Sequence, residues 1–160
     1  MEKKEELFDL ISTYSSMIEL KSEEYINVIL SNSQNSKVDI TNPAISLSYN
    51  NIGDNIYLVN LDFTQGYVVG EKVIAEFRMQ QSGVFAIQAG DDSVSDFIEL
   101  ALNVSCPDIL FPYVRPVHNI LISQNGIKPA EIPVFNFYQA YLNEKKNKSL
   151  ADKEDNSNLH

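Results

Sequence analysis

Cysteine and histidine are the residues of this sequence that could most readily carry nucleophilic chemistry. The chain has one cysteine, Cys106, and two histidines, His118 and His160. If Cys106 and His118 shared one helix, they would be separated by about 18 Å, and no third residue stands out that would orient the pair. A lone free cysteine is more typical of a small buried hydrophobe than of a nucleophile. We therefore expect Cys106 to be structural and the protein not to be an enzyme.

Metal and cofactor chemistry is also poorly supported by the residue types. The sequence contains no Cys/His cluster with the spacing of metal ligands, and its six glycines are scattered singly, unlike those of a phosphate-binding loop. The adjacent carboxylates Asp91 and Asp92 precede a helical pattern, so they are better explained as helix-start residues. We expect no cofactor and no metal site.

Apolar side chains in the last third of the chain offer a different chemistry, the binding of apolar polypeptide segments. Such side chains supply a large contact area at low entropic cost. Ile127, Ile132 and Phe135 lie on an extended connection that contains two prolines, and not all of it can be buried, so they favour the wall of a groove. Phe111 and Tyr113 are further candidates for this client-binding groove, although the ordinary core explains these two better.

Charge and composition limit the partners. The formal net charge is −10, and between Val38 and Leu100 the only basic residues are Lys72 and Arg78. Nucleic acids and anionic membranes attract clustered Lys and Arg, so we expect neither as a partner, although acidic charge also serves solubility alone. No apolar run reaches the roughly 20 residues that span a bilayer, and the charged stretch 1–6 is unlike a signal peptide. We expect a cytoplasmic protein without membrane insertion.

The elements that position these residues begin with a sheet. From Tyr57 to Met79 apolar and polar residues alternate, with Val59, Leu61 and Phe63 on one face, and stretch 44–49 alternates in the same way. This period of two is typical of antiparallel strands with one wet face. The pattern predicts a long hairpin that turns at Gly70, with Gly66 at a bulge or a close approach and Ser82-Gly83 interrupting the second strand.

The two ends of the chain show other patterns. Leu7, Ile11, Tyr14 and Ile18 recur at helical spacing, which predicts an amphipathic helix in an N-terminal extension, residues 1–22. Stretch 23–30 alternates and predicts a first strand within the main domain, residues 23–143. The polar, charged composition of residues 144–160 predicts a disordered tail.

Helices follow the sheet. An apolar pattern predicts one helix through residues 94–101, a break near Ser105 to Pro107, and a second helix that ends near Gln124 with Asn125-Gly126 as its C-cap. Pro116 inside this second helix predicts a kink or a start near Pro112. A last helix starts at Asn136. Because no helix separates the strands, the fold class is α+β rather than alternating α/β.

Three collinear motifs carry a family resemblance. Residues 106–115, CPDILFPYVR, closely resemble the signature of the SecB family of export chaperones. Residues 80–87, QQSGVFAI, resemble the end of a strand in that family, and Gly126, Pro129, Pro133 and Asn136-Phe137 fall where the family has its crossover loop and last helix. The order and spacing agree from about Tyr57 to about Lys145.

The resemblance implies a four-stranded antiparallel sheet with helices packed on one face. It implies a homotetramer, a dimer of dimers, that binds unfolded or precursor polypeptides without ATP. It also implies delivery of these clients to the export ATPase SecA. A chaperone of this kind is a holdase, and its groove needs no catalytic residue.

One departure from the family concerns docking of the ATPase. Family members that dock SecA carry an exposed leucine and an acidic residue, which meet the basic tail of the ATPase, at the positions of Glu76 and Arg78. Arg78 reverses the expected charge there, and like charges that face one another weaken binding. General export is the main hypothesis. The alternatives are a dedicated chaperone of an antitoxin and a non-chaperone module that recognises a folded partner.

Overall fold

The computed structural model describes residues 6–23, 37–90 and 94–157. Within these ranges, five strands form one antiparallel sheet: β1 (Leu7–Ser22), β2 (Val38–Ile40), β3 (Ala44–Gly53), β4 (Ile56–Val69) and β5 (Lys72–Gln88). The strand order is β1-β5-β4, and both β2 and β3 pair with the other edge of β4. The sheet thus has four strand positions, as predicted, with the outermost position divided between β2 and β3.

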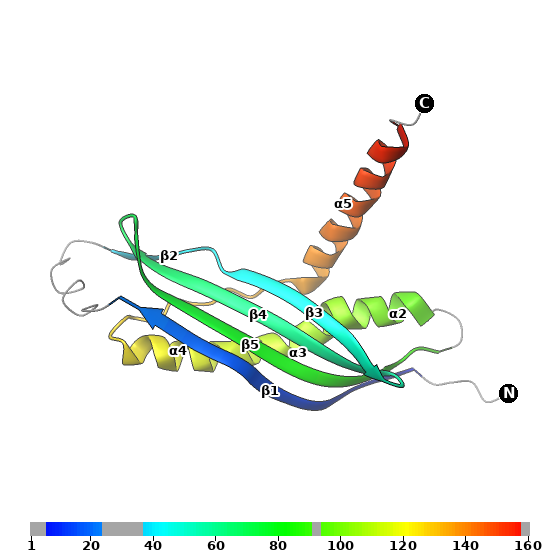
Figure 1. The fold of residues 1–160 in the computed structure, drawn as a ribbon, viewed down its shortest axis with the longest axis horizontal. Helices are drawn as coiled ribbons and strands as arrows, with labels where there is room; N and C mark the ends of the chain where they lie inside the picture. Colours follow the sequence, from blue (N-terminus) through cyan, green and yellow to red (C-terminus); the bar gives the residue numbers. More distant parts are fainter. Residues whose placement is uncertain (1–5, 24–36, 91–93, 158–160) are drawn as a thin grey trace.

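A nearly continuous helical run covers one face of the sheet (Figure 1). It consists of α2 (Val94–Leu100), a π-helical turn (Ala101–Ser105), α3 (Cys106–Leu110), a 3₁₀ turn (Phe111–Tyr113) and α4 (Val114–Gln124). Its buried stripe recurs every four residues and consists of Cys106, Leu110, Val114, His118 and Ile122, all with no exposed surface. Residues Ser95–Gln124 are long and apolar enough to meet the length and composition test for a membrane span. In the structure 44% of the apolar window is buried, including residues of the stripe that packs on the sheet.

The predicted break before Pro107 is wrong, and the π-helical turn gives the physical reason. Pro107 has no N–H to donate and its ring would clash with a carbonyl one turn earlier in a regular helix. The backbone N–H of Cys106 bonds the carbonyl of Ala101, which widens the turn just before the proline. The helical run therefore accommodates Pro107 without ending. Pro116 stands in the first turn of α4, where an N–H is not needed.

The predicted N-terminal helix is also wrong, because residues Leu7–Ser22 form strand β1 along β5. Two register shifts, between Leu10 and Ser12 and between Ser15 and Met17, interrupt its pairing. Each bulge changes the face to which the following residues point. A strand with bulges places apolar residues at irregular intervals, and here the intervals imitate a helix.

Other boundaries differ from expectation as well. Helix α5 (Phe137–Ser157) continues through most of the stretch predicted to be a disordered tail, and it extends away from the sheet (Figure 1). Strand β5 runs through Ser82-Gly83 without interruption. The first strand predicted at 23–30 and the caps at Asp91 and Asp92 lie outside the described residues, except for Glu23.

Two glycines permit close approaches that shape the fold. A Cβ on Gly83 would lie 2.8 Å from Leu110 Cδ2 and 2.6 Å from Phe85 Cε2, so glycine lets α3 pack tightly on β5. A Cβ on Gly66 would lie 3.0 Å from Thr41 Cγ2, and the Gly66 N–H donates to Thr41 Oγ1 at 2.8 Å. The predicted close approach at Gly66 is confirmed.

Candidate functional site

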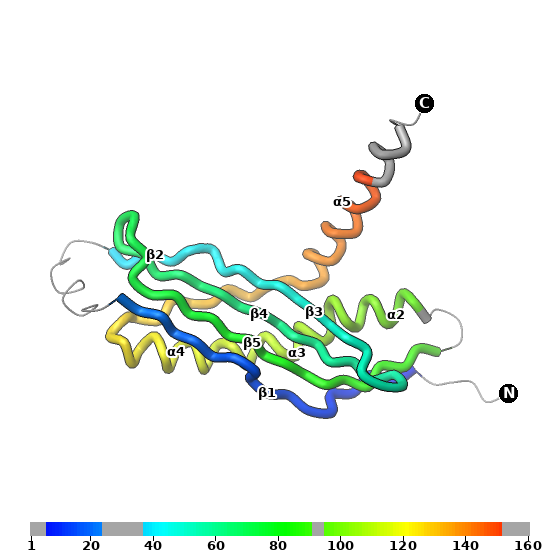
Figure 2. The backbone as a smooth tube through the Cα atoms, viewed as in Figure 1, coloured from blue at the N-terminus to red at the C-terminus, as the bar shows by residue number. Residues whose placement is uncertain are grey.

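The connection between α4 and α5, residues 125–136, is the crossover segment of this fold. It returns along the sheet on the side of β2 and β3 (Figure 2). Helix α4 ends as the sequence predicts: Gly126 has a φ of 74°, and its N–H donates to the Ser123 carbonyl at 3.0 Å. From there to Phe137 the segment has no helix or strand.

Side chains of the crossover segment divide between the core and the surface. Ile127 and Ile132 are buried, with 3% and 8% of their surface exposed. Val134 is 85% exposed and Phe135 is 37% exposed. The two isoleucines anchor the segment, and residues 134–135 leave an apolar surface open to solvent.

The first hollow lies between β3 and α5 and has a volume of about 450 Å³. Its apolar wall combines Ile45 and Leu47 of β3 with Phe135 and Phe137. The rings of Phe135 and Phe137 pack edge to face, with centroids 4.6 Å apart. An apolar segment entering this hollow would therefore meet aromatic and aliphatic surface on both sides.

Charged residues border the first hollow and link α5 to α2. Lys145 Nζ lies 3.2 Å from Glu99 Oε2 and 4.9 Å from the centroid of the Tyr141 ring. These contacts, together with hydrogen bonds, raise the pKa of Lys145 to about 12, the bond to Tyr141 being the largest cause. Lys148 pairs with Glu144 at 2.7 Å. Both lysines therefore line the first hollow as cations.

Two further hollows lie on either side of the crossover segment. The second, about 500 Å³, is lined by Arg115 and Asn119 of α4 and by residues 129–134. The third, about 370 Å³, is lined by Val38 and Ile40 of β2, by Tyr67, and by residues 126–130. Accessible concave surface thus follows the crossover segment from β2 to α5.

The predicted groove residues are only partly brought together. Phe135 lines the first hollow, Ile132 the second and Ile127 the third. Phe111 is 5% exposed and packs on Phe63 and Phe137 in the core. Tyr113 is 44% exposed but lines none of these hollows. A role of these five residues in client binding stays a prediction.

Cys106 and His118 do not form a catalytic pair. The Cys106 thiol is fully buried, and burial raises its pKa to about 12, which leaves it protonated and unreactive near neutral pH. His118 bonds Tyr67 instead: Tyr67 Oη and His118 Nε2 are 2.7 Å apart. The structural role expected for Cys106 is confirmed, whereas the sequence offered no sign of the Tyr67–His118 contact.

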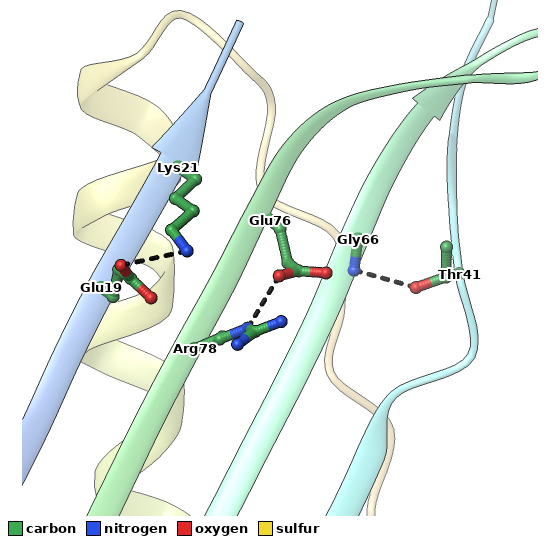
Figure 3. Close-up of polar contacts among 6 residues, drawn as sticks. All are labelled: Glu19, Lys21, Thr41, Gly66, Glu76 and Arg78. Atoms are coloured by element: carbon green, nitrogen blue, oxygen red, sulfur yellow. Dashed lines mark hydrogen bonds and ion pairs between the residues drawn. The ribbon is translucent and has the colours of Figure 1, made fainter.

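Glu76 and Arg78 lie on the open face of the sheet, which the helices do not cover. Arg78 Nε donates to Glu76 Oε1 at 2.7 Å within β5 (Figure 3). On the neighbouring strand β1, Lys21 Nζ lies 3.4 Å from Glu19 Oε1. The register places Glu19 opposite Arg78 and Lys21 opposite Glu76. Opposite charges therefore alternate along and across the two strands, and this patch is nearly self-neutralised.

Large apolar side chains remain exposed elsewhere on the single chain. On β1 they include Ile11, which is 55% exposed, and on α4 they include Ile120, which is 58% exposed. These residues lie on an edge strand and on a helix of the layer that covers the sheet. Large apolar side chains that gather in an exposed patch are typical of surfaces that pack against other chains.

Comparison with known proteins gives a consistent result. Residues 2–148 match the family model described as preprotein translocase subunit SecB. Protein-export protein SecB of Xanthomonas euvesicatoria pv. vesicatoria (strain 85-10) is 34% identical over 125 residues, which cover 72% of each chain. The protein of the same name from Stenotrophomonas maltophilia (strain K279a) is 34% identical over 107 residues, covering 64% of this chain and 60% of that protein.

A solved structure shows the same fold. It is a Mycobacterium tuberculosis SecB-like chaperone in complex with a peptide from an antitoxin, with a TM-score of 0.58 and 10% sequence identity. The match covers 81% of this chain and 91% of the other. The family match includes the residues of strand β1.

Proposed function

Because this chain belongs to the SecB family of protein-export chaperones, which are not enzymes, we propose that it is an ATP-independent holdase for unfolded or precursor polypeptides. The observation that carries this proposal is the hollow of about 450 Å³ between β3 and α5. It presents aromatic and aliphatic surface beside the edge of β3 that pairs with no other strand among the described residues. An extended client could bury apolar side chains there and pair its backbone with β3.

Holding a client in this way needs no nucleotide. Burial of apolar surface stabilises a complex by roughly 25 cal/mol for each Å² removed from water. A protein that binds only the unfolded state shifts the folding equilibrium of its client by mass action. The acidic net charge of −10 would also attract clients with basic segments.

Assembly and location complete the proposal. We infer that the chain forms a homotetramer, a dimer of dimers, in the cytoplasm, and that copies of the chain cover the exposed apolar residues of β1 and α4. Ile11 and Ile120, each more than half exposed in the single chain, support this inference.

A dedicated chaperone of an antitoxin is the second candidate. The ion pair between Arg78 and Glu76 favours it, because this pair removes the negative charge that a basic tail of SecA would meet. The structural neighbour binds an antitoxin peptide. The third alternative, a module for a folded partner, loses part of its support because residues Leu7–Ser22 form a strand of the family sheet and not a new helix.

The first test is suppression of aggregation. A chemically unfolded model protein is diluted into buffer without nucleotide, with and without an equimolar amount of this chain, and light scattering is followed. We expect near-stoichiometric suppression. If scattering is unchanged, general holdase activity is excluded, and tight binding of a single antitoxin segment would then identify the dedicated chaperone.

A further inference from the structure

A buried polar contact joins strand β4 to helix α4 beneath the crossover segment. Tyr67 and His118 each have 0% of their surface exposed. Their rings stack with centroids 5.9 Å apart, and Tyr67 Oη lies 2.7 Å from His118 Nε2. The remaining ring neighbours of His118 are apolar, because Phe63 and Phe77 pack edge to face on it.

The orientation of the Asn119 side chain fits one assignment of donors and acceptors around this contact. His118 Nδ1 lies 3.1 Å from Asn119 Oδ1, and an amide oxygen only accepts, so Nδ1 carries the proton. His118 Nε2 is then the acceptor of the Tyr67 hydroxyl. The hydroxyl oxygen in turn accepts from the backbone N–H of Ala130 at 3.5 Å. The bonds thus run from Ala130 through Tyr67 to His118, with a second bond from His118 to Asn119.

This chain of bonds ends in the crossover segment. Ala130 lies between Ile127 and Ile132, which anchor the segment. Tyr67 also lines the third hollow together with Val38, Ile40 and residues 126–130. Tyr67 therefore contacts residue 130 of the segment and lines the same hollow as residues 126–130.

Protonation of His118 would reverse the direction of its hydrogen bond with Tyr67. With both ring nitrogens protonated, Nε2 becomes a donor and the Tyr67 hydroxyl hydrogen loses its acceptor in a buried place. No ion pair of His118 with a carboxylate occurs among the residues that the structure describes. Besides the Tyr67 hydroxyl, the charged residues that are close in sequence to the contact are Arg115, one turn earlier in α4, and Lys128 and Glu131, on either side of Ala130.

We propose that Tyr67 and His118 are positioning residues that latch the crossover segment beside the third hollow, and that acidification opens this latch, displaces the segment and weakens client binding at the hollows that it lines. The link to clients rests on the proposed holdase function, whereas the latch itself does not. Tyr67 and His118 do not need to touch the client, because they act through Ala130 and the position of residues 126–132.

The direction of the pH effect follows from burial. Desolvation lowers the pKa of His118 below its ordinary value of 6.5, and the bond to Asn119 only partly opposes it. The latched state therefore has its full stability above the ordinary pKa. This stability falls as the pH drops below that value and through the lowered pKa of the latched state.

Hydrogen exchange of the free, full-length protein tests the latch without any client. Protection of the hydrogen-bonded amides of Gly126, Ile127 and Ala130 is measured at pH 7.5 and pH 5.5, after correction for the pH dependence of intrinsic exchange. We expect wild type to lose protection there at pH 5.5 while amides of β4 and β5 keep theirs. His118→Gln retains an uncharged acceptor that does not titrate, so its crossover segment should stay protected at both pH values.

Two variants complete the exchange experiment. Tyr67→Phe keeps the ring and removes the hydroxyl, so the crossover segment should exchange rapidly even at pH 7.5. His160→Gln replaces the second histidine of the chain and should behave like wild type. Equal protection of the wild-type segment at both pH values overturns the proposal, as does the same loss of protection in His118→Gln.

Binding of a permanently unfolded probe, reduced and carboxymethylated α-lactalbumin, tests the coupling to clients. We expect its Kd to rise severalfold between pH 7.5 and pH 5.5 for wild type and to stay constant for His118→Gln. A constant wild-type Kd overturns the coupling. If the probe fails to bind at either pH while exchange remains pH-dependent, the latch is supported and general holdase activity is excluded.

Discussion

Single charged residues decide what the open face of the sheet can bind. Arg78 bonds Glu76 and lies opposite Glu19, so each carboxylate in this patch has a cation beside it. Exposed pairs such as these add little to stability, about 0–1 kcal/mol. Their effect is on recognition, because a neutralised patch exerts no long-range attraction on a basic partner.

Arg78→Glu should therefore strengthen binding of the basic SecA tail severalfold, and the gain should shrink as salt is added, because salt screens exposed charges. Titration of a labelled tail peptide at low and moderate ionic strength measures this effect. Lys148→Glu makes the same change of net charge on α5, where it also breaks an exposed pair, and serves as the matched control. Equal affinities for wild type and Arg78→Glu would contradict the prediction, and equal gains in both variants would show that only net charge matters.

Residue types alone predict the burial of some side chains but not the contacts of others. A lone cysteine beside a proline predicts burial, and Cys106 is buried with a raised pKa. The contact of Tyr67 with His118 joins residues 51 apart in the sequence, and neither residue type by itself indicates the other. Contacts of this kind depend on how α4 crosses the sheet, which a pattern of residue types does not contain.

At the scale of elements, the crossover segment and the start of α5 form the accessible apolar surface. The first hollow depends on Phe135, whose ring packs on Phe137 and remains 37% exposed. Aromatic residues that combine a packed ring with an open face often contribute most of the energy of an interface. Under the proposed function, Phe135 is the residue at which a client would meet both β3 and α5.

Phe135→Ser should lower the affinity for an unfolded client by about tenfold, which corresponds to roughly 1.4 kcal/mol. Fluorescence anisotropy of a labelled, permanently unfolded probe measures this loss. Ile52→Ser is the control, because Ile52 is 56% exposed on β3 and lines none of the three hollows. A loss of similar size in both variants would mean that general surface hydrophobicity, and not the first hollow, binds the client.

The sequence predicts long regular elements better than irregular ones. Strict alternation in β4 and β5 predicts their hairpin, because both strands have one buried face. The alternation rule does not predict strand β1, because two bulges change which face of the sheet its residues point to. The break expected before Pro107 fails for a related reason, since a single widened turn absorbs the proline.

At the scale of the whole molecule, one chain leaves apolar surface that an assembly would cover. Ile120 of α4 is 58% exposed, and Ile11 of β1 is 55% exposed. Burying a side chain of this size stabilises by about 1.5–3 kcal/mol relative to leaving it in water. Repeated in every copy of a tetramer, such contacts would supply a large part of the energy of association.

Ile120→Glu should reduce the solution mass from that of a tetramer of the 18.1 kDa chain to that of a smaller species, because an unpaired carboxylate resists burial. Size-exclusion chromatography with light scattering measures the mass, and circular dichroism checks the fold. Gln124→Glu adds the same charge on the exposed surface of α4 and should keep the assembly. A tetrameric Ile120→Glu would show that this surface of α4 is not an interface.

The architecture of the molecule follows largely from the sequence, and the site does so only in part. Alternating strands followed by helices predict the α+β class, and the motif around Cys106 to Arg115 predicts the family. The hollows require contacts between β2 or β3 and residues 126–148. These segments are far apart in sequence, and only the folded chain shows which side chains remain uncovered between them.

The division of the outer strand position into β2 and β3 has a consequence for self-association. An unpaired strand edge is a template for cross-β fibril growth, and a protein that gathers unfolded chains brings such strands close to its own edge. Residues 41–43, which include Pro43, separate the three residues of β2 from the ten of β3. Because Pro43 has no N–H to donate, this interruption limits the continuous edge to the ten residues of β3.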